Sequence, residues 1–343
     1  MGLYRLARYK KYESVSVEVL LYHMSKTALI TGIAGQDGSY LSEYLLSQGY
    51  EVHGIIRRNS VAENQDDRIK DLNVTTHYGD LLDIHSLHRI VAEVKPDEVY
   101  NLGAQSHVRI SFDVPSFTIQ TNAIGVLNML EVCRMHVPHV KFYQASSSEM
   151  FGNSVDDDGY QRKTTPMLPT SPYGCAKVMG YNLVRHYRAA YDMHTCNGIL
   201  FNHESPRRGS NFVTNKIVKG AVEIYKGKRK ELALGNLDAS RDWGHSKDYV
   251  RAMHKIVNHE EASDWTVATG ESRTIRQMCE TTFAYLDLDY RDFVTVDSKF
   301  FRPQELNFLR GDSSEIRERL NWEPEYTFEG MVEEMVDHWK ELI

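Results

Sequence analysis

Short apolar segments alternate with longer amphipathic segments from residue 27 to about residue 200. The apolar segments are rich in β-branched and aromatic residues, which is typical of strands buried on both faces of a sheet. We predict strands at Thr27–Thr31, Glu51–Ile56, Val74–Tyr78, Glu98–Leu102, Lys141–Ala145 and Thr195–Leu200. The segments between them carry apolar residues at helical spacing. We predict helices near Gly38–Gln48, Ile84–Val94, Ile119–Met135 and Pro172–Tyr191.

This alternation predicts an α/β fold with a Rossmann-type doubly wound parallel sheet, because parallel strands are joined by right-handed helical crossovers. After about residue 203 the loops lengthen and the apolar segments shorten, which indicates a smaller mixed α/β domain. There we predict strands at Glu231–Leu234, Trp265–Ala268 and Phe293–Val296, and helices near Ser272–Leu286 and Phe328–Leu342. We interpret residues 24–202 as a dinucleotide-binding domain and residues 203–343 as mainly a substrate domain. A helix at Ser246–His259 is expected to return to the sheet, within a stretch near 240–260.

Composition narrows the function. The chain has 343 residues and a net charge of −7, which argues against a general nucleic-acid-binding protein. No apolar run approaches the roughly 20 residues of a membrane span. The four cysteines form no C-x-x-C pair and the 15 histidines no H-E-x-x-H pattern, so we expect no metal site and a cytoplasmic protein. Residues 1–23 lack a sustained apolar region, and we expect a dispensable extension rather than a secretory signal.

A glycine-rich turn follows the first predicted strand and predicts dinucleotide binding. Gly32, Gly35 and Gly38 enclose Gln36 and Asp37 at the start of a helix. Glycines allow close approach of the backbone to a pyrophosphate, and the helix N-terminus faces it. The later strand ends would complete the site. Asp80 and Leu81 would flank the adenine, and Leu102, Ala104 and Ser106 would lie beside the nicotinamide.

The second predicted strand ends in Arg57, Arg58 and Ser60, without the carboxylate that usually holds the ribose of NAD. Guanidinium groups suit a 2′-phosphate, which favours NADP over NAD and makes residues 24–202 an NADP-binding domain. The alternative is a solvated basic loop.

Four residues suggest the chemistry. Tyr173 and Lys177 lie one helical turn apart, so the lysine can assist a tyrosine whose ordinary pKa is near 10. Ser147 and Glu149 follow the fifth predicted strand. A carboxylate there could take a carbon-bound proton, which plain redox chemistry does not require. The three aspartates at 156–158 favour a solvated loop over a metal site.

With these residues in view, the chain from residue 24 onward resembles the GDP-mannose 4,6-dehydratases, a family of the extended short-chain dehydrogenase/reductase superfamily. The resemblance is carried by TGIAGQDGSYL at 31–41, QASSSEMFG at 144–152, NHESPRRG at 202–209, GNLDASRDWGHSKDYV at 235–250 and RPQE at 302–305. The third and fourth of these stretches are far more specific than the glycine turn or the Tyr/Lys pair.

The resemblance implies a reaction and roles for residues. GDP-D-mannose would become GDP-4-dehydro-6-deoxy-D-mannose plus water on bound NADP, in a homodimer or homotetramer. Tyr173 would be the catalytic base, Lys177 its partner and contact of the cofactor, and Glu149 the base for the C5 proton. His203 and Arg208 would join the cofactor site. The substrate contacts would be Asn202, Lys216, Arg241, Arg302 and Glu305.

Two positions depart from the family pattern. Ser147 stands where threonine is usual, and Phe117 where a cofactor-contacting tyrosine is common. A looser Ser147 would fit a side reaction in which NADPH reduces the keto product to GDP-D-rhamnose. Two other functions stay open: a nucleotide-sugar epimerase on the same scaffold, for which Glu149 would have no task, and a non-catalytic NADP-binding regulator.

Overall fold

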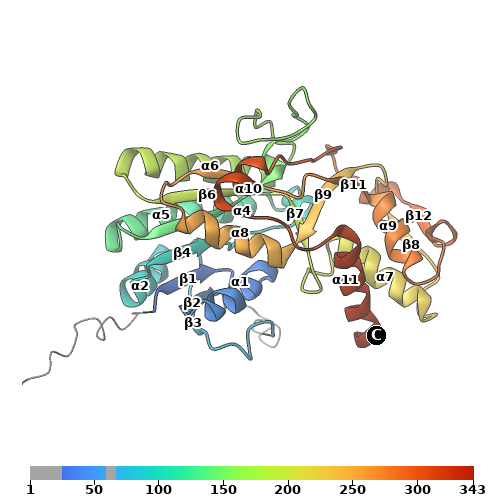
Figure 1. Cartoon of the computed structure of the whole chain (residues 1–343), viewed down its shortest axis with the longest axis horizontal. Helices are drawn as coiled ribbons and strands as arrows, with labels where there is room; N and C mark the ends of the chain where they lie inside the picture. The colour runs from blue at the N-terminus through green and yellow to red at the C-terminus, as the bar shows by residue number, and fades with distance from the viewer. Residues whose placement is uncertain (1–24, 59–66) are drawn as a thin grey trace, which may run out of the picture.

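The computed structural model describes residues 25–58 and 67–343; residues 1–24 and 59–66, with the predicted cofactor residue Ser60, lie outside the described part. A parallel sheet of seven strands dominates it, in the order β10-β6-β5-β4-β1-β2-β3 (Figure 1). The strands are β1 (Thr27–Thr31), β2 (Glu51–Ile56), β3 (Thr75–Tyr78), β4 (Glu98–Asn101), β5 (Lys141–Ser147), β6 (Thr195–Leu200) and β10 (Asp264–Val267). The predicted doubly wound sheet is confirmed.

Helices cover both faces of this sheet. One face packs against α1 (Gln36–Ser47) and α8 (Ser246–Asn258), whose buried side chains join those of β1, β6 and β10 in one core. The other face packs against α2 (Ile84–Val94), α5 (Gly125–His136) and α6 (Pro172–Tyr191). The predicted return of the 246–259 helix to the sheet is therefore confirmed.

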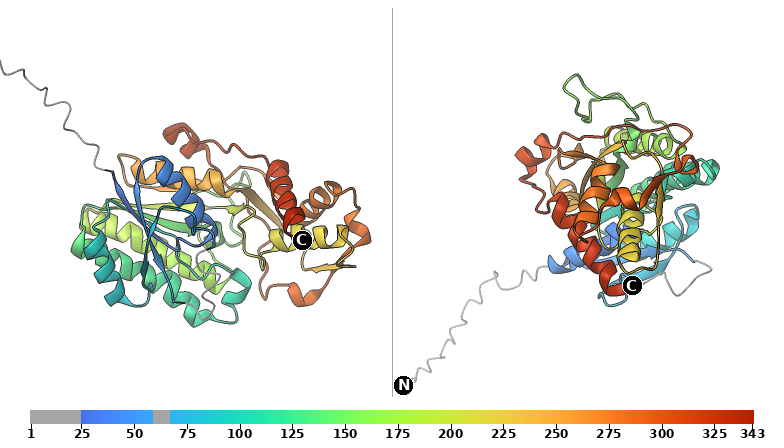
Figure 2. Two further views of the ribbon diagram at one scale, coloured as in Figure 1. Left: turned by 90° about the horizontal axis from the view of Figure 1, so that it is seen from below. Right: turned by 90° about the vertical axis from the view of Figure 1, so that its right-hand side faces the viewer.

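The smaller part lies at the carboxyl ends of the strands (Figures 1 and 2). It contains a three-stranded sheet of β7 (Asn202–Glu204), β9 (Ser240–His245) and β11 (Ser272–Thr274), and a parallel pair of β8 (Leu232–Leu234) and β12 (Val294–Val296). The helices α7 (Val213–Tyr225), α9 (Ile275–Ala284) and α11 (Phe328–Leu342) enclose a separate apolar core with them. A short helix, α10 (Ser314–Leu320), packs instead near β10 through Ile316.

Several predicted elements are corrected. The strand predicted at 265–268 was counted with the smaller part, but β10 pairs with β6 in the main sheet. The helix predicted at 119–135 is divided into α4 (Pro115–Ile119), a π-helical turn (Gln120–Ile124) and α5. The helix predicted from residue 272 starts only after β11, and α7 and β9 were not predicted. In the described part of the chain, none of the helices has the length and apolar character needed to cross a membrane.

Candidate active site

A cavity of about 550 Å³ lies between the carboxyl ends of the sheet and the smaller part. Residues from both parts line it, and they come from positions 37 to 305 of the chain. The predicted site residues that line it are Asp37, Leu102, Ala104, Ser106, Ser147, Glu149, Tyr173, Lys177, Asn202, His203, Arg208, Lys216, Arg241, Arg302 and Glu305. The fold thus brings together all four residues predicted for the chemistry and all five predicted for the substrate.

The glycine turn has the tight geometry that its sequence predicted. Gly32 has a φ of +71°, which favours glycine, and the Gly35 amide donates to the Gly32 carbonyl at 2.9 Å. A Cβ on Gly38 would lie 2.4 Å from the Gly32 oxygen. The turn also meets β4, where the Gly103 amide donates to Thr31 Oγ1 at 2.9 Å. The strands β2 and β3 lie on one side of β1, and β4, β5 and β6 lie on the other side. Folds of this kind bind ligands in the crevice where the strand order changes side, which here lies between β1 and β4.

Asp37, in the first turn of α1, meets His203 of β7. His203 Nε2 lies 2.8 Å from Asp37 Oδ2, and His203 Nδ1 lies 2.7 Å from the Phe201 carbonyl, so both ring nitrogens face acceptors. Burial alone would lower the pKa of His203, but the Asp37 carboxylate outweighs it and the pKa is raised. Burial would raise the pKa of Asp37, and the charge of His203 lowers it instead. The pair therefore favours an imidazolium next to a carboxylate.

Gln36 holds this pair in place, and Arg208 lies in the loop that follows β7. The Gln36 amide donates to the His203 carbonyl at 3.2 Å and accepts from the Ser205 hydroxyl at 2.8 Å. Arg208 lies over the Phe212 ring, and its Nε is 2.9 Å from a Glu204 carboxylate oxygen. The loop after β7 is thereby tied to the start of α1.

Tyr173 and Lys177 lie in the first turns of α6, which Ser171 caps by accepting from the Gly174 amide. Lys177 Nζ donates to the Ala145 carbonyl at 2.7 Å and is 5.7 Å from the centre of the Tyr173 ring. Burial raises the pKa of Tyr173 to about 12, against the effect of a hydrogen bond with Ser147. Burial also lowers the pKa of Lys177 to about 8. Both groups are thus shifted toward their neutral forms.

Glu149 is 6% exposed and lies in a 3-10 turn (Ser148–Met150) directly after β5. Its backbone amide donates to the Ser147 hydroxyl at 3.2 Å, and both residues line the cavity. Arg302 Nη1 donates to Glu149 Oε1 at 3.1 Å. The carboxylate is therefore paired with a residue that was predicted as a substrate contact.

Two cationic side chains and one polar atom without a hydrogen-bond partner among the residues described belong to residues that line the same cavity. Arg241 is 7% exposed, and its hydrogen bond in the described part of the chain goes to the Ser240 carbonyl. Burial lowers the pKa of Arg241 to about 10. Lys216 Nζ donates to the Ala233 carbonyl and lies 3.6 Å from the centre of the Phe300 ring. Within the described residues the buried Asn202 Oδ1 has no hydrogen-bond partner. Such a site suits a polyanionic ligand.

The residues predicted for the adenosine end lie outside this cavity. Arg58 and Asp80 line a second hollow of about 580 Å³ at the ends of β2 and β3, with Arg89 of α2. Leu81 is buried, and its side chain packs against Gly103 and Gly125. Gly32, Gly35, Gln36 and Gly38 form the turn around Asp37 and are not in the described lining of the main cavity. Arg57 is exposed at the end of β2.

Sequence reasoning did not single out several residues that line the main cavity. His107, Asn211, Phe212 and Phe300 are among them. His107 directly follows Ser106, which the sequence placed beside the nicotinamide, but nothing in the sequence places Phe212 or Phe300 beside the sheet. Phe117 is 42% exposed on α4 and is absent from the described cavity lining.

The chain matches the family model described as GDP-mannose 4,6 dehydratase over residues 29–335. It is 48% identical to GDP-mannose 4,6 dehydratase 2 of Arabidopsis thaliana over 92% of this chain and 87% of that protein. It is 45% identical to GDP-mannose 4,6 dehydratase of Homo sapiens over 92% of each.

Among solved structures, it is similar in fold to a UDP-glucose 4-epimerase with UDP-glucose from Thermotoga maritima, with a TM-score of 0.81 and 23% identity over 92% of this chain and 99% of that one. The match to the family model and the level of identity to its members show that the chain belongs to the GDP-mannose 4,6-dehydratase family.

Proposed function

We propose that this protein dehydrates GDP-D-mannose to GDP-4-dehydro-6-deoxy-D-mannose and water, with bound NADP. The observation that carries the proposal is the position of Glu149, buried in the same cavity as Tyr173 and Lys177. Epimerisation at C4 needs a base for the hydroxyl and no second base for a C–H bond. The likeness to an epimerase structure concerns the fold alone.

The residues fit a nicotinamide dinucleotide. The turn at Gly32–Gly38 leaves backbone where a Cβ would collide, and the N-terminus of α1 follows it. Gln36, Asp37, His203 and Arg208 would hold the cofactor near the turn, with Leu102, Ala104, Ser106 and Lys177 beside its nicotinamide half. When bound, this cofactor accepts a hydride from the sugar C4 and later returns it to C6.

Tyr173 and Glu149 would each remove one proton from the sugar. Tyr173 would take the proton of the C4 hydroxyl, with the charge of Lys177 nearby and the Ser147 hydroxyl in contact. Once C4 is a ketone, the C5 proton is acidified, and Glu149 would remove it as the C6 hydroxyl departs as water. The C5 proton leaves with the C6 hydroxyl as water, and the proton that Tyr173 took from the C4 hydroxyl balances the one that C5 gains when the hydride returns to C6.

We infer that the GDP moiety lies toward the smaller part, where Lys216, Arg241, Arg302, Asn202 and Glu305 line the cavity. The buried Arg241 supports this inference, since a buried guanidinium that has no carboxylate partner among the described residues suits a diphosphate. On this proposal residues 24–202 bind NADP and residues 203–343 contribute mainly to the substrate side.

The direct test is incubation of the purified protein with GDP-mannose, UDP-glucose and dTDP-glucose, followed by mass spectrometry. A 4-keto-6-deoxy product, lighter by one water, is expected from GDP-mannose alone. Equal conversion of all three nucleotide sugars, or a C4 epimer without water loss, would refute the assignment.

NADP is proposed over NAD because the sequence that follows β2 continues with Arg57 and Arg58, where an NAD-preferring protein usually has an acidic residue. Calorimetry should give a dissociation constant for NADP at least about tenfold below that for NAD, since one charge-assisted contact to phosphate contributes roughly 1.5–3 kcal/mol. Equal constants would contradict the preference.

We also propose a cytoplasmic homodimer or homotetramer. The outer surfaces around α5 and α6 expose the apolar side chains of Ile124, Met135, Met179 and Tyr191, which a second subunit could cover. Sedimentation equilibrium would distinguish these assemblies from a monomer.

A further inference from the structure

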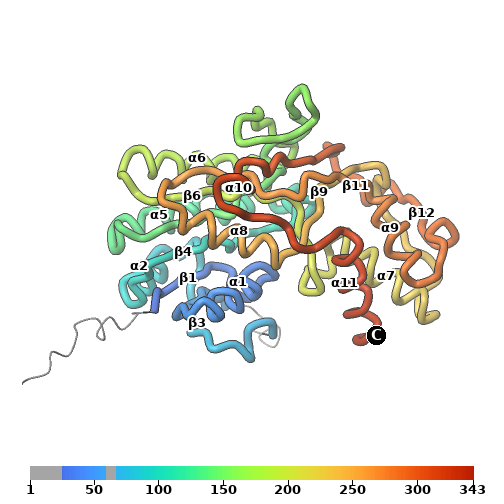
Figure 3. The backbone as a smooth tube through the Cα atoms, viewed as in Figure 1, coloured from blue at the N-terminus to red at the C-terminus, as the bar shows by residue number. Residues whose placement is uncertain are grey.

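A long loop, residues 151–171, joins the turn that carries Glu149 to the helix that carries Tyr173. We call it the brace loop. It lies beside residues 302–314, the arginine segment, which begins with Arg302 and leads into α10 (Figure 3). The two stretches are about 150 positions apart in sequence. The arginine segment reaches the cavity through Arg302 and Glu305, and the brace loop connects the cavity residues Glu149 and Tyr173 along the chain.

Asn153 makes the first connection, four residues after Glu149. Its side-chain Nδ2 donates to the Glu305 carbonyl at 3.0 Å, and its Oδ1 accepts from the Asn307 amide at 2.9 Å. One amide group thus binds both the carbonyl and the N–H of a short backbone stretch. Because both bonds are made by a single planar group, they restrict the position and the orientation of this stretch.

The restrained stretch in turn holds Arg302. Glu305 Oε1 accepts from the Arg302 amide at 2.7 Å, and Arg302 Nη1 reaches Glu149 at 3.1 Å. A closed path therefore runs from Glu149 along the chain to Asn153, across to Glu305, and back through Arg302 to Glu149. Asn153 does not line the described part of the cavity, so its connection to the site runs through this path.

Gln161 makes the second connection and is fully buried. Its backbone N–H donates to the Arg310 carbonyl at 2.9 Å, and its carbonyl accepts from the Asp312 amide at 3.0 Å. Its side chain donates to the Ser154 carbonyl at 2.8 Å and accepts from the Arg310 amide. The brace loop is therefore bound to itself and to the arginine segment through one residue.

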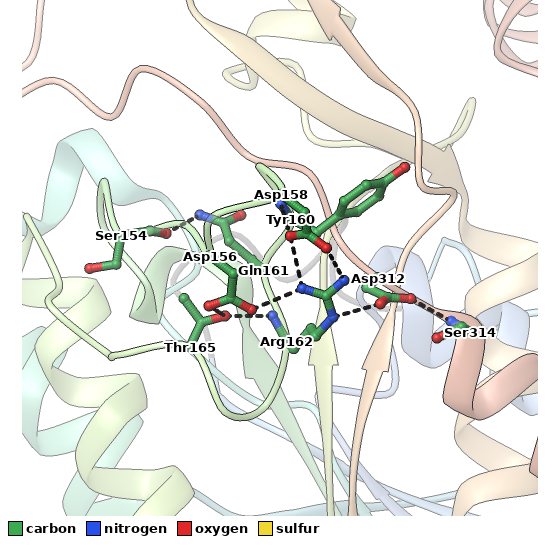
Figure 4. Close-up of polar contacts among 9 residues, drawn as sticks. All are labelled: Ser154, Asp156, Asp158, Tyr160, Gln161, Arg162, Thr165, Asp312 and Ser314. Carbon is green, nitrogen blue, oxygen red and sulfur yellow. Dashed lines mark hydrogen bonds and ion pairs between the residues drawn. The ribbon is translucent and has the colours of Figure 1, made fainter.

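Arg162 makes the third connection (Figure 4). Its Nε donates to Asp312 at 2.7 Å, while its terminal nitrogens bind Asp156 at 3.0 Å and Asp158 at 2.6 Å. Two of the three aspartates that the sequence assigned to a solvated loop, Asp156 and Asp158, thus form ion pairs with Arg162. The ion cluster ties the far end of the arginine segment to the loop.

We propose that Asn153 is a positioning residue for the Arg302–Glu149 pair, and that the brace loop fixes the arginine segment against the active site. This inference rests on the proposed function. Glu149 must meet the C5 proton within hydrogen-bonding distance, and Arg302 is one of the cations that faces the diphosphate. Loss of the Asn153 contacts leaves the Glu305–Asn307 stretch free to move away, and Arg302 moves with it.

The test is a double-mutant cycle on kcat/KM for GDP-mannose, with the variants Asn153→Ala, Arg302→Gln and the double variant. Asn153→Ala should lower kcat/KM about tenfold, because two hydrogen bonds are lost. In the Arg302→Gln background the same change should lower it less than about twofold, since the residue through which it acts is already gone. Asn153→Asp keeps the acceptor for the Asn307 amide but not the donor to the Glu305 carbonyl. Its kcat/KM should therefore lie between the values of the wild-type protein and of Asn153→Ala.

The matched control is Arg319→Gln, which removes exposed ion pairs of the following helix to Glu315 and Glu261 and should leave kcat/KM unchanged. Equal losses from Asn153→Ala in both backgrounds would show a general structural role and overturn the proposal. Wild-type activity in Asn153→Ala would overturn it as well.

If the wild-type protein does not dehydrate GDP-mannose, the proposed function fails, and the cycle is measured on GDP affinity by calorimetry. The positioning role then predicts weaker GDP binding in Asn153→Ala that disappears in the Arg302→Gln background. Additive losses of GDP affinity would overturn the inference in that case too.

Discussion

Arg241 offers a prediction in which substrate affinity and protein stability respond in opposite directions. The side chain is 7% exposed, faces the cavity, and bonds to the Ser240 carbonyl without a carboxylate partner in the described part of the chain. A buried cation of this kind costs folding free energy and is favourable only when an anion arrives. Replacing it with methionine keeps an unbranched, flexible side chain and removes the charge.

The burial and the contacts of Arg241 give the expected changes in the free energy of unfolding and in the dissociation constant for GDP. Burial lowers the pKa of Arg241 from 12.5 to about 10, which corresponds to about 3 kcal/mol lost by the charged form in the folded protein. Arg241→Met removes this cost together with the bond to Ser240, so the free energy of unfolding should stay equal or rise, by about 3 kcal/mol at most. A charge-assisted contact to the diphosphate contributes about 1.5–3 kcal/mol, so the dissociation constant for GDP should rise about 10- to 150-fold.

Two assays measure these quantities. Calorimetric titration with GDP, which lacks the sugar, isolates the contribution of the diphosphate. Chemical denaturation of the unliganded protein gives the free energy of unfolding. The comparison variant is Arg188→Met, because Arg188 on α6 is ion-paired with Asp264 at 2.5 Å and does not line the cavity. It should lose stability, by about 1.5–3 kcal/mol, because the hydrogen bonds from Arg188 to Asp264 and to the Thr195 carbonyl are lost while Arg185 stays 3.4 Å from the carboxylate. GDP affinity should not change.

The reasoning is refuted if Arg241→Met unfolds at lower denaturant concentration, as Arg188→Met is expected to do, since Arg241 would then be a structural residue. Unchanged GDP affinity would refute its assignment to the diphosphate.

Four further outcomes are expected. Glu149→Gln should lower the rate of water loss about 10²–10⁴-fold with GDP-mannose binding retained, because the amide cannot accept the C5 proton; near-normal dehydration would identify a different base. Tyr173→Phe should show no transient absorbance of reduced cofactor after substrate is added in a stopped-flow experiment, and a normal burst would exclude Tyr173 as the C4 base. Burial lowers the pKa of Lys177 to about 8, so its charge is lost as the pH rises through that value, and C4 oxidation should slow above about pH 8; a rate that keeps rising to pH 10 would contradict its role. Excess NADPH with the isolated keto product should yield some GDP-D-rhamnose, and persistence of the ketone over many turnover times would rule out this side reduction.

Much of the main domain followed from local pattern. The predicted β1, β2 and β6 and the predicted α2 and α6 have the observed bounds, because each is a short buried strand or a helix with a clear start, such as the cap Ser171 before Pro172. The cavity residues at strand ends were also predictable, since carboxyl ends of parallel strands must meet at one edge. The glycine turn and the Tyr173–Lys177 pair are local signals of the same kind.

Tertiary contacts decided the rest. The strand Asp264–Val267 has no local signal that distinguishes the main sheet from the smaller one, and its pairing with β6 depends on how α8 packs. Periodicity likewise does not register the π-helical turn at Gln120–Ile124, because its central residues, Thr121 to Ala123, stay buried as on the inner face of a regular helix.

The pairing of Glu149 with Arg302 and the contacts of Asn153 and Arg162 join positions about 150 residues apart. Sequence by itself determined which residue types are present at the strand ends and in the helices. Only the folded chain decided which charges meet, because ion pairs and side-chain hydrogen bonds act over a few ångströms in space and leave no periodic trace along the chain.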